Sequence, residues 1–309
     1  MTSSSSSGVT ANALRIGRTG ASRVIFGHGL GDSPRGWADV CGFWSREIPH
    51  IQFVLPAAPM REVTLNDGML MPAWYDLPSQ ETLASYDSRL HMDAVGIEEA
   101  VAMYSEHVLD PAQTVFAGFS QGAGVALYTG VSAALVSKAR GRAGVPLGIL
   151  ALSGYLPATK SLLALADSLR KDVIANKPLG GGATGESTTT SSKKSADDQN
   201  KSGSGAGATS TTGKMEEDPS AALTPLDVLD CSHVPVLLCH GTEDTMVSFD
   251  NAVKTKNFLF EEFSIQAELA EFPGMGHEAC QEEVDRVTKW LRDRFRNFGN
   301  VEDVQPSTL

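Results

Sequence analysis

The stretch TVFAGFSQG, residues 114–122, joins a short apolar run to the pattern G-x-S-x-G. The run 114–117 is typical of a buried strand, and the residues from Gly122 onward are typical of a helix. A serine on so sharp a turn needs small neighbours, which Gly118 and Gly122 supply. The helix would direct its N-terminal N–H groups and positive dipole end at that serine. The stretch therefore predicts Ser120 as a nucleophile, and the alternative is that Ser120 only caps the helix.

Short apolar runs alternate with helix-like segments on both sides of this stretch. The apolar runs are 23–26, 51–55, 114–117, 148–152, 234–239 and 267–272. The helix-like segments are 37–47, 90–108, 122–137, 250–263 and 278–298. Alternation of this kind predicts an α/β fold with a mostly parallel central sheet and helices on both faces.

One stretch departs from this pattern. Residues 181–214 contain no Val, Ile, Leu, Met, Phe, Trp or Tyr, so they cannot bury enough apolar surface to offset the entropy of ordering. We expect a single domain over 13–298 that a flexible, low-complexity insert interrupts at about 160–220, with a disordered Ser-rich N-terminus (1–12) and a C-terminal tail (299–309). The insert is either a tolerated expansion of a surface loop or a segment for docking or modification.

Composition excludes several classes of protein. The chain has 309 residues and a net charge of −12 without a basic block, which argues against nucleic-acid binding. No apolar run approaches the roughly 20 residues of a membrane span, and the Ser-rich start lacks the features of a secretory signal. The four cysteines form no CxxC pair. We therefore expect reduced thiols and a cytoplasmic protein, with transient membrane contact at most.

Two further strand ends carry residues that suit a nucleophilic serine. Asp244 follows the run 234–239, and His277 lies in a glycine-flanked loop after the run 267–272. With Ser120 they give the chain order Ser, Asp, His, in which the histidine is the base and the acid orients it. Glu243 and Asp250 are competing acids, although Asp250 is better explained as a helix cap.

A glycine-rich loop, GHGLGD at residues 27–32, follows the run 23–26. Its backbone can approach a substrate closely, and the tetrahedral intermediate of acyl transfer needs two N–H donors for its oxyanion. We predict that Leu30 gives one donor and Gln121, the residue after the serine, gives the other. For His28 an architectural hydrogen bond is the favoured role, and His240 is interpreted as a structural residue.

These motifs together resemble those of the acyl-protein thioesterases, also called the lysophospholipase/carboxylesterase family of α/β hydrolases. The motifs, spread in the right order from about residue 23 to 295, are HGLGD (28–32), PAAP (56–59) with VTLN (63–66), MPAWYD (71–76), GFSQG (118–122), LSGYLP (152–157), HGTED (240–244) and GH (276–277). The resemblance implies the triad Ser120, Asp244 and His277 with oxyanion donors Leu30 and Gln121. It also implies hydrolysis of thioesters or oxyesters without a metal or a cofactor.

The resemblance further implies a groove for a long acyl chain. Met69, Leu70, Met71 and Trp74 are large apolar residues in what reads as a loop, so we predict that they line or cover this groove. The expected substrates are S-acylated proteins such as palmitoyl-proteins, lysophospholipids or carboxylic esters. Two alternatives remain: a short-chain carboxylesterase without a preference for lipid, and a non-catalytic scaffold that acts through its insert. The sequence leaves the oligomeric state open.

Overall fold

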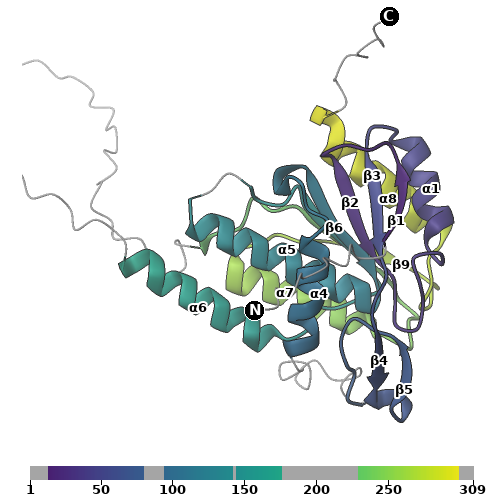
Figure 1. The fold of residues 1–309 in the computed structure, drawn as a ribbon, viewed down its shortest axis with the longest axis horizontal. Helices are drawn as coiled ribbons and strands as arrows, with labels where there is room; N and C mark the ends of the chain where they lie inside the picture. Colours follow the sequence, from purple (N-terminus) through teal and green to yellow (C-terminus); the bar gives the residue numbers. More distant parts are fainter. Residues whose placement is uncertain (1–12, 80–93, 142–143, 176–228, 299–309) are drawn as a thin grey trace, which may run out of the picture.

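The structure of the chain, a computed structural model, describes residues 13–79, 94–141, 144–175 and 229–298. Its centre is a seven-stranded sheet of order β1-β3-β2-β6-β7-β8-β9 (Figure 1). The strands are β1 (Ala13–Gly17), β2 (Arg23–Gly27), β3 (Gln52–Pro56), β6 (Thr114–Phe119), β7 (Gly148–Leu152), β8 (Val236–Gly241) and β9 (Glu268–Phe272). All are parallel except β1, which runs antiparallel to β3. The predicted mostly parallel sheet is confirmed.

The inner strands are apolar throughout because helices cover both faces of the sheet. Every residue of β2, β3, β7 and β8 is buried. Helices α1 (Ala38–Glu47) and α8 (Gln281–Phe295) pack on one face, and α4 (Ala94–Ser105), α5 (Gln121–Ala139), α6 (Thr159–Ala175) and α7 (Phe249–Phe263) lie on the other (Figure 1). No helix in the described part of the chain is long and apolar enough to cross a membrane.

Helix α6 shows that the predicted start of the flexible insert, near residue 160, is wrong. It occupies the start of the segment that was expected to be flexible, and it packs against α5. Its buried residues Leu162, Ala166 and Leu169 recur at helical spacing, so they give α6 a face that the core stabilises. The flexible insert therefore does not begin near residue 160. Residues 181–214, the Ser-rich N-terminus and the C-terminal tail lie outside the described residues.

Two further elements were absent from the prediction. Strand β1 forms one edge of the sheet, and a separate hairpin pairs β4 (Met60–Val63) with β5 (Met69–Pro72). A single 3₁₀ turn, η1 (Thr64–Asn66), connects the two hairpin strands. The segment 69–72, which was interpreted as a loop, is thus a strand. The hairpin lies at the bottom of the view, away from helices α1 and α8 at the upper right (Figure 1).

Candidate active site

Ser120 lies on a tight turn between β6 and α5. Its φ of 53° is in the left-handed region, and its N–H donates to Leu152 O over 2.8 Å. The flanking glycines are required sterically. A Cβ on Gly118 would lie 2.4 Å from the backbone of Gly122, and a Cβ on Gly122 would lie 2.3 Å from Gly27 O. The turn therefore holds Ser120 in a strained conformation of the kind that functional sites retain.

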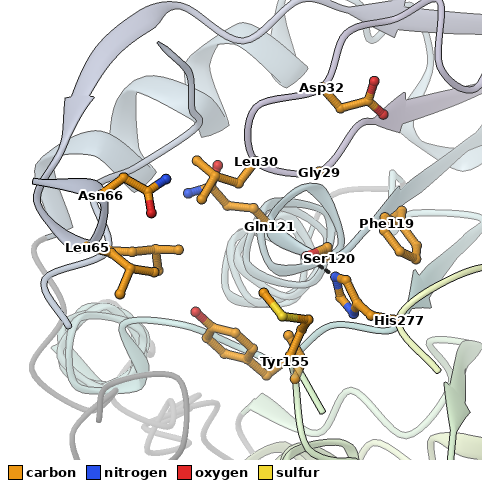
Figure 2. A pocket seen from close by; sticks show the side chains of 13 residues that line it. Gly29, Leu30, Asp32, Leu65, Asn66, Phe119, Ser120, Gln121, Tyr155 and His277 are labelled. Carbon is orange, nitrogen blue, oxygen red and sulfur yellow. Dashed lines mark hydrogen bonds between the residues drawn. The ribbon is translucent and has the colours of Figure 1, made fainter. Parts of the chain in front are cut away.

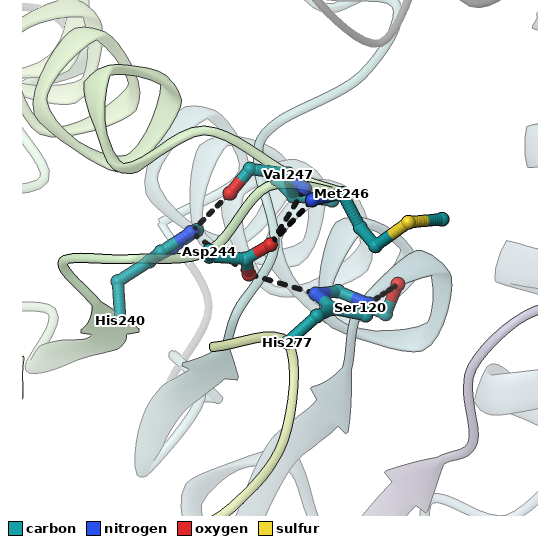
Figure 3. Close-up of polar contacts among 6 residues, drawn as sticks. All are labelled: Ser120, His240, Asp244, Met246, Val247 and His277. Carbon is teal, nitrogen blue, oxygen red and sulfur yellow. Dashed lines mark hydrogen bonds and ion pairs between the residues drawn. The ribbon is translucent and has the colours of Figure 1, made fainter. Parts of the chain in front are cut away.

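The Ser120 hydroxyl belongs to a chain of hydrogen bonds (Figure 3). Ser120 Oγ is 2.9 Å from His277 Nε2, and His277 Nδ1 is 2.7 Å from Asp244 Oδ2. Because the carboxylate only accepts, His277 Nδ1 carries the proton and Nε2 is free to accept from the serine. Ser120 makes no side-chain cap on α5, so the alternative that it merely caps the helix does not describe this structure.

The Asp244 carboxylate is buried and well supplied with donors. Its Oδ1 accepts from the Met246 and Val247 N–H groups, at 2.9 and 2.8 Å. Burial acts to raise the pKa of Asp244, but hydrogen bonds from His240, His277 and the Val247 N–H outweigh it and hold that pKa well below its usual range. Asp244 is therefore ionised at neutral pH and can stabilise a positive charge on His277.

The competing acids lie elsewhere. Glu243 is exposed. Asp250 stands inside the first turn of α7, where it pairs with Lys254 at 2.8 Å. The helix begins at Phe249 after Ser248, so the prediction that Asp250 caps it is wrong.

The glycine-rich loop after β2 is fixed from two sides. The buried His28 ring accepts a hydrogen bond from Ala58 N–H at Nε2 and donates from Nδ1 to Gly29 O, at 3.1 and 2.8 Å. Burial lowers the pKa of His28, which keeps this ring neutral. On the other side, Gly31 N–H donates to Pro72 O over 2.8 Å. This geometry fits the architectural role predicted for His28 and sets the loop beside Ser120.

Gln121 connects this loop region to α5. Its side-chain Oε1 accepts from Trp74 N–H, and its Nε2 donates to Tyr75 O. The Trp74 indole in turn donates to His28 O over 2.8 Å. Since Gln121 is the first residue of α5, its own N–H has no partner within the helix. The structure thus brings Gln121 and Leu30 together at one pocket with Ser120 (Figure 2).

The pocket has a volume of about 280 Å³, near the lower end of the ~300–1,000 Å³ typical of ligand sites. It is lined by Gly29, Leu30, Asp32, Leu65, Asn66, Leu77, Phe119, Ser120, Gln121, Tyr155, Met246, Val247 and His277 (Figure 2). Apolar side chains form much of its wall. The Phe119 ring also packs on His277, with centroids 4.9 Å apart.

Several lining residues were missed by sequence reasoning, although a usable signal was present. Tyr155 follows β7, and Met246 and Val247 follow β8, so they stand at the carboxyl ends of parallel strands. Leu65 and Asn66 come from the hairpin turn η1, which was not predicted.

The residues predicted to contact an acyl chain do not line this pocket. Trp74 is fully buried and packs edge-on against the Tyr104 ring, so it belongs to the core. Met69 and Leu70 point into solvent on β5, with exposed fractions of 63% and 59%. Met71 is half-buried beside Asn66, whose amide contacts its sulfur. The exposed residues lie on β5, whereas Trp74 follows the strand and packs into the core.

A strand-to-helix turn that carries a serine, with histidine and aspartate on later loops of a parallel sheet, defines the class of the α/β hydrolases. Within the described residues, no group of three or more His, Cys, Asp or Glu side chains has the arrangement of a metal site.

Comparison with known proteins agrees with this class. A family model described as phospholipase/carboxylesterase matches residues 17–176 and 206–294. An acyl-protein thioesterase 1 homolog of Dictyostelium discoideum is 39% identical over 158 residues, which span 50% of this chain and 65% of that protein. The acyl-protein thioesterase 1 of Neurospora crassa is 28% identical over 281 residues, which span 88% of this chain and 86% of that protein.

Among solved structures, the chain is similar to Zea mays acyl-protein thioesterase 2, with a TM-score of 0.60 at 22% identity. The match covers 92% of this chain and 99% of the maize chain, and it supports the fold. Because the family model matches most of the sequence, the chain belongs to the phospholipase/carboxylesterase family of α/β hydrolases and is a serine hydrolase of ester or thioester bonds. The unmatched residues 177–205 fall in the predicted low-complexity insert.

Proposed function

We propose that Ser120, His277 and Asp244 are the catalytic triad of this hydrolase. The observation that carries the proposal is the unbroken chain of two hydrogen bonds, 2.9 and 2.7 Å long, from Ser120 Oγ to Asp244. Ser120 Oγ attacks the carbonyl carbon of the substrate while His277 Nε2 takes its proton, and His277 then gives that proton to the leaving alcohol or thiol. Water hydrolyses the acyl-enzyme by the same route.

The N–H groups of Leu30 and Gln121 are the proposed oxyanion donors. Both residues line the pocket beside Ser120, and Gln121 N–H lies at the positive end of α5. Donors of this kind are worth about 3–4 kcal/mol each in the transition state. The hydrogen bonds of His28 and Trp74 would keep the Leu30 loop in place before substrate arrives.

The proposed substrates are acyl thioesters and esters with an apolar chain, as in S-acylated proteins and lysophospholipids. Two observations support this choice: relatives named acyl-protein thioesterase, and a pocket wall with Leu65, Leu77 and Val247. A pocket of this size fits the reacting group and part of a chain. The remainder would leave past Met246, which is 55% exposed at the pocket. The proposed location is the cytoplasm, with transient contact to membranes.

A fluorophosphonate probe tests the nucleophile. We expect the wild type to be labelled and Ser120→Ala to show neither labelling nor ester hydrolysis. Stoichiometric labelling of the variant would disprove the assignment, and so would an unlabelled, inactive wild type. A panel of p-nitrophenyl esters from acetyl to octanoyl, with acyl thioesters and lysophospholipids, then ranks the substrates. The short-chain carboxylesterase alternative predicts the highest kcat/KM at acetyl or butyryl, and the scaffold alternative predicts no hydrolysis.

A further inference from the structure

His240 lies at the carboxyl end of β8, four residues before Asp244, and it is 1% exposed. Its Nε2 is 2.7 Å from Val247 O and 3.4 Å from Asp244 Oδ2, the same oxygen that His277 contacts (Figure 3). Phe249 packs edge-on against its ring. The ring therefore touches the aspartate of the triad without touching Ser120 or the pocket.

The protonation of the ring follows from its partners. A carbonyl oxygen only accepts hydrogen bonds, so His240 Nε2 must carry a proton for Val247 O. Among the described residues, Nδ1 is buried and has no hydrogen-bond partner. A second proton there would be a buried donor without an acceptor, which is unfavourable. The geometry thus fits a neutral ring whose single N–H is shared between Val247 O and Asp244 Oδ2.

This N–H closes a small network around Asp244. Val247 N–H donates to Asp244 Oδ1, Val247 O accepts from His240, and Asp244 Oδ2 lies beside both histidines. The turn 244–247 is therefore held at its carboxylate and at its last carbonyl. Met246 and Val247 from the same turn line the pocket.

We propose that His240 is a positioning residue for the reaction, an inference that rests on the triad proposed above. Its Nε2–H fixes the turn 244–247, so that Asp244 Oδ2 stays directed at His277 Nδ1. Without that donor, Val247 O is buried and unsatisfied, and the turn relaxes. Asp244 then no longer holds His277 in the orientation that proton transfer from Ser120 requires.

Two amide substitutions separate positioning from packing. In His240→Gln the side-chain amide reaches the place of Nε2 and can still donate to Val247 O. In His240→Asn the chain is one methylene shorter, so the amide lies near the place of Nδ1, where no acceptor lies among the described residues. We expect the Asn variant to lose about 10- to 100-fold in kcat on p-nitrophenyl acetate, with a smaller change in KM. The Gln variant should stay within about threefold of wild-type kcat.

Leu238→Ala is the matched control. Leu238 is buried on the same face of β8, two residues earlier, and it lines no part of the pocket. We expect Leu238→Ala to have a lower Tm than the wild type, and to have the wild-type kcat at temperatures well below that Tm. Equal kcat for the Asn variant and the wild type would overturn the proposal. Equal losses in the Gln, Asn and Leu238→Ala variants would also overturn it, because they would reflect general destabilisation. Fluorophosphonate labelling of wild-type Ser120 reports separately on the triad itself.

Discussion

Trp74 is fully buried, and its indole Nε1–H donates a 2.8 Å hydrogen bond to the carbonyl oxygen of His28 in the glycine-rich loop. Its backbone N–H also donates to the Gln121 side chain. Both proposed oxyanion donors therefore depend on the position of one aromatic residue. A side chain that touches no substrate can still affect every substrate, because it sets the geometry that all of them share.

We expect Trp74→Phe to lower kcat/KM about tenfold, and by a similar factor on acetyl and octanoyl esters, because a buried carbonyl loses its donor. Leu65→Ala provides the contrast. Since Leu65 lines the pocket, its loss should reduce the octanoyl rate more than the acetyl rate. Steady-state kinetics on the ester series measures both. A loss confined to octanoyl in Trp74→Phe would restore the original acyl-contact prediction.

Glu283 in the first turn of α8 is a second residue whose role depends on burial. It is 1% exposed, and neither carboxylate oxygen has a partner among the described residues. Burial raises its pKa from 4.5 to about 8. The folded protein therefore keeps a proton that the unfolded chain has already lost. This difference makes the free energy of unfolding fall as pH rises from 4.5 towards 8, by at most about 1.4 kcal/mol per pH unit.

Glu283→Gln should remove that dependence. We expect the variant to match the wild type near pH 5 and to exceed it by several kcal/mol at about pH 8, as measured by urea denaturation. Glu282→Gln, an exposed neighbour, is the control and should leave the wild-type pH dependence in place. Parallel stability curves for wild type and Glu283→Gln would show that the carboxyl is not protonated in the fold.

At the scale of elements, the β4–β5 hairpin both contributes to the pocket and exposes apolar side chains. Its turn η1 supplies Leu65 and Asn66 to the pocket, and its strands expose Met60, Met69 and Leu70. Large apolar side chains that are exposed on one element are typical of a surface that contacts another apolar surface. Their place on the element that lines the pocket is consistent with the proposed transient contact between this enzyme and a membrane.

We expect the double variant Met69→Ser, Leu70→Ser to hydrolyse acyl substrates in phospholipid vesicles about tenfold more slowly, because it buries less apolar surface in the lipid. Hydrolysis of soluble p-nitrophenyl acetate should be unchanged, since neither side chain lines the pocket. The double variant Leu109→Ser, Phe260→Ser removes exposed apolar surface elsewhere and serves as control. Equal rates on vesicles for all three proteins would exclude the hairpin from membrane contact.

At the scale of the molecule, the low-complexity segment contains none of the proposed catalytic residues. The residues of the proposed triad follow β6, β8 and β9, and the family model matches sequence on both sides of residues 177–205. Helix α6, which precedes the segment, packs on α5.

Deleting residues 181–214 should leave kcat/KM for p-nitrophenyl acetate within about threefold of wild type, because closure entropy changes slowly with loop length. The deletion must spare α6, whose apolar face contributes to the core. Circular dichroism and Tm check that the variant is folded. A folded variant that loses activity would show that the segment acts on the site.

The sequence alone was sufficient for the parallel sheet and for the three residues that meet at its carboxyl edge. Buried strands read as apolar runs, and Ser120, Asp244 and His277 each follow such a run. Parallel topology brings the ends of strands to one edge, so local signals were enough to place them together. The two glycines beside Ser120 are equally local, because the turn itself excludes a Cβ.

Only the tertiary structure decided which of the apolar residues in the segment 69–74 are exposed and which form the core. Met69, Leu70 and Trp74 look alike in sequence, yet the first two are exposed and the third is fully buried. The same holds for His240 and His277, which both lie near Asp244 but differ in their contact with Ser120. The physical reason is that burial and hydrogen-bond partners come from segments distant in the chain, whose packing no local pattern records.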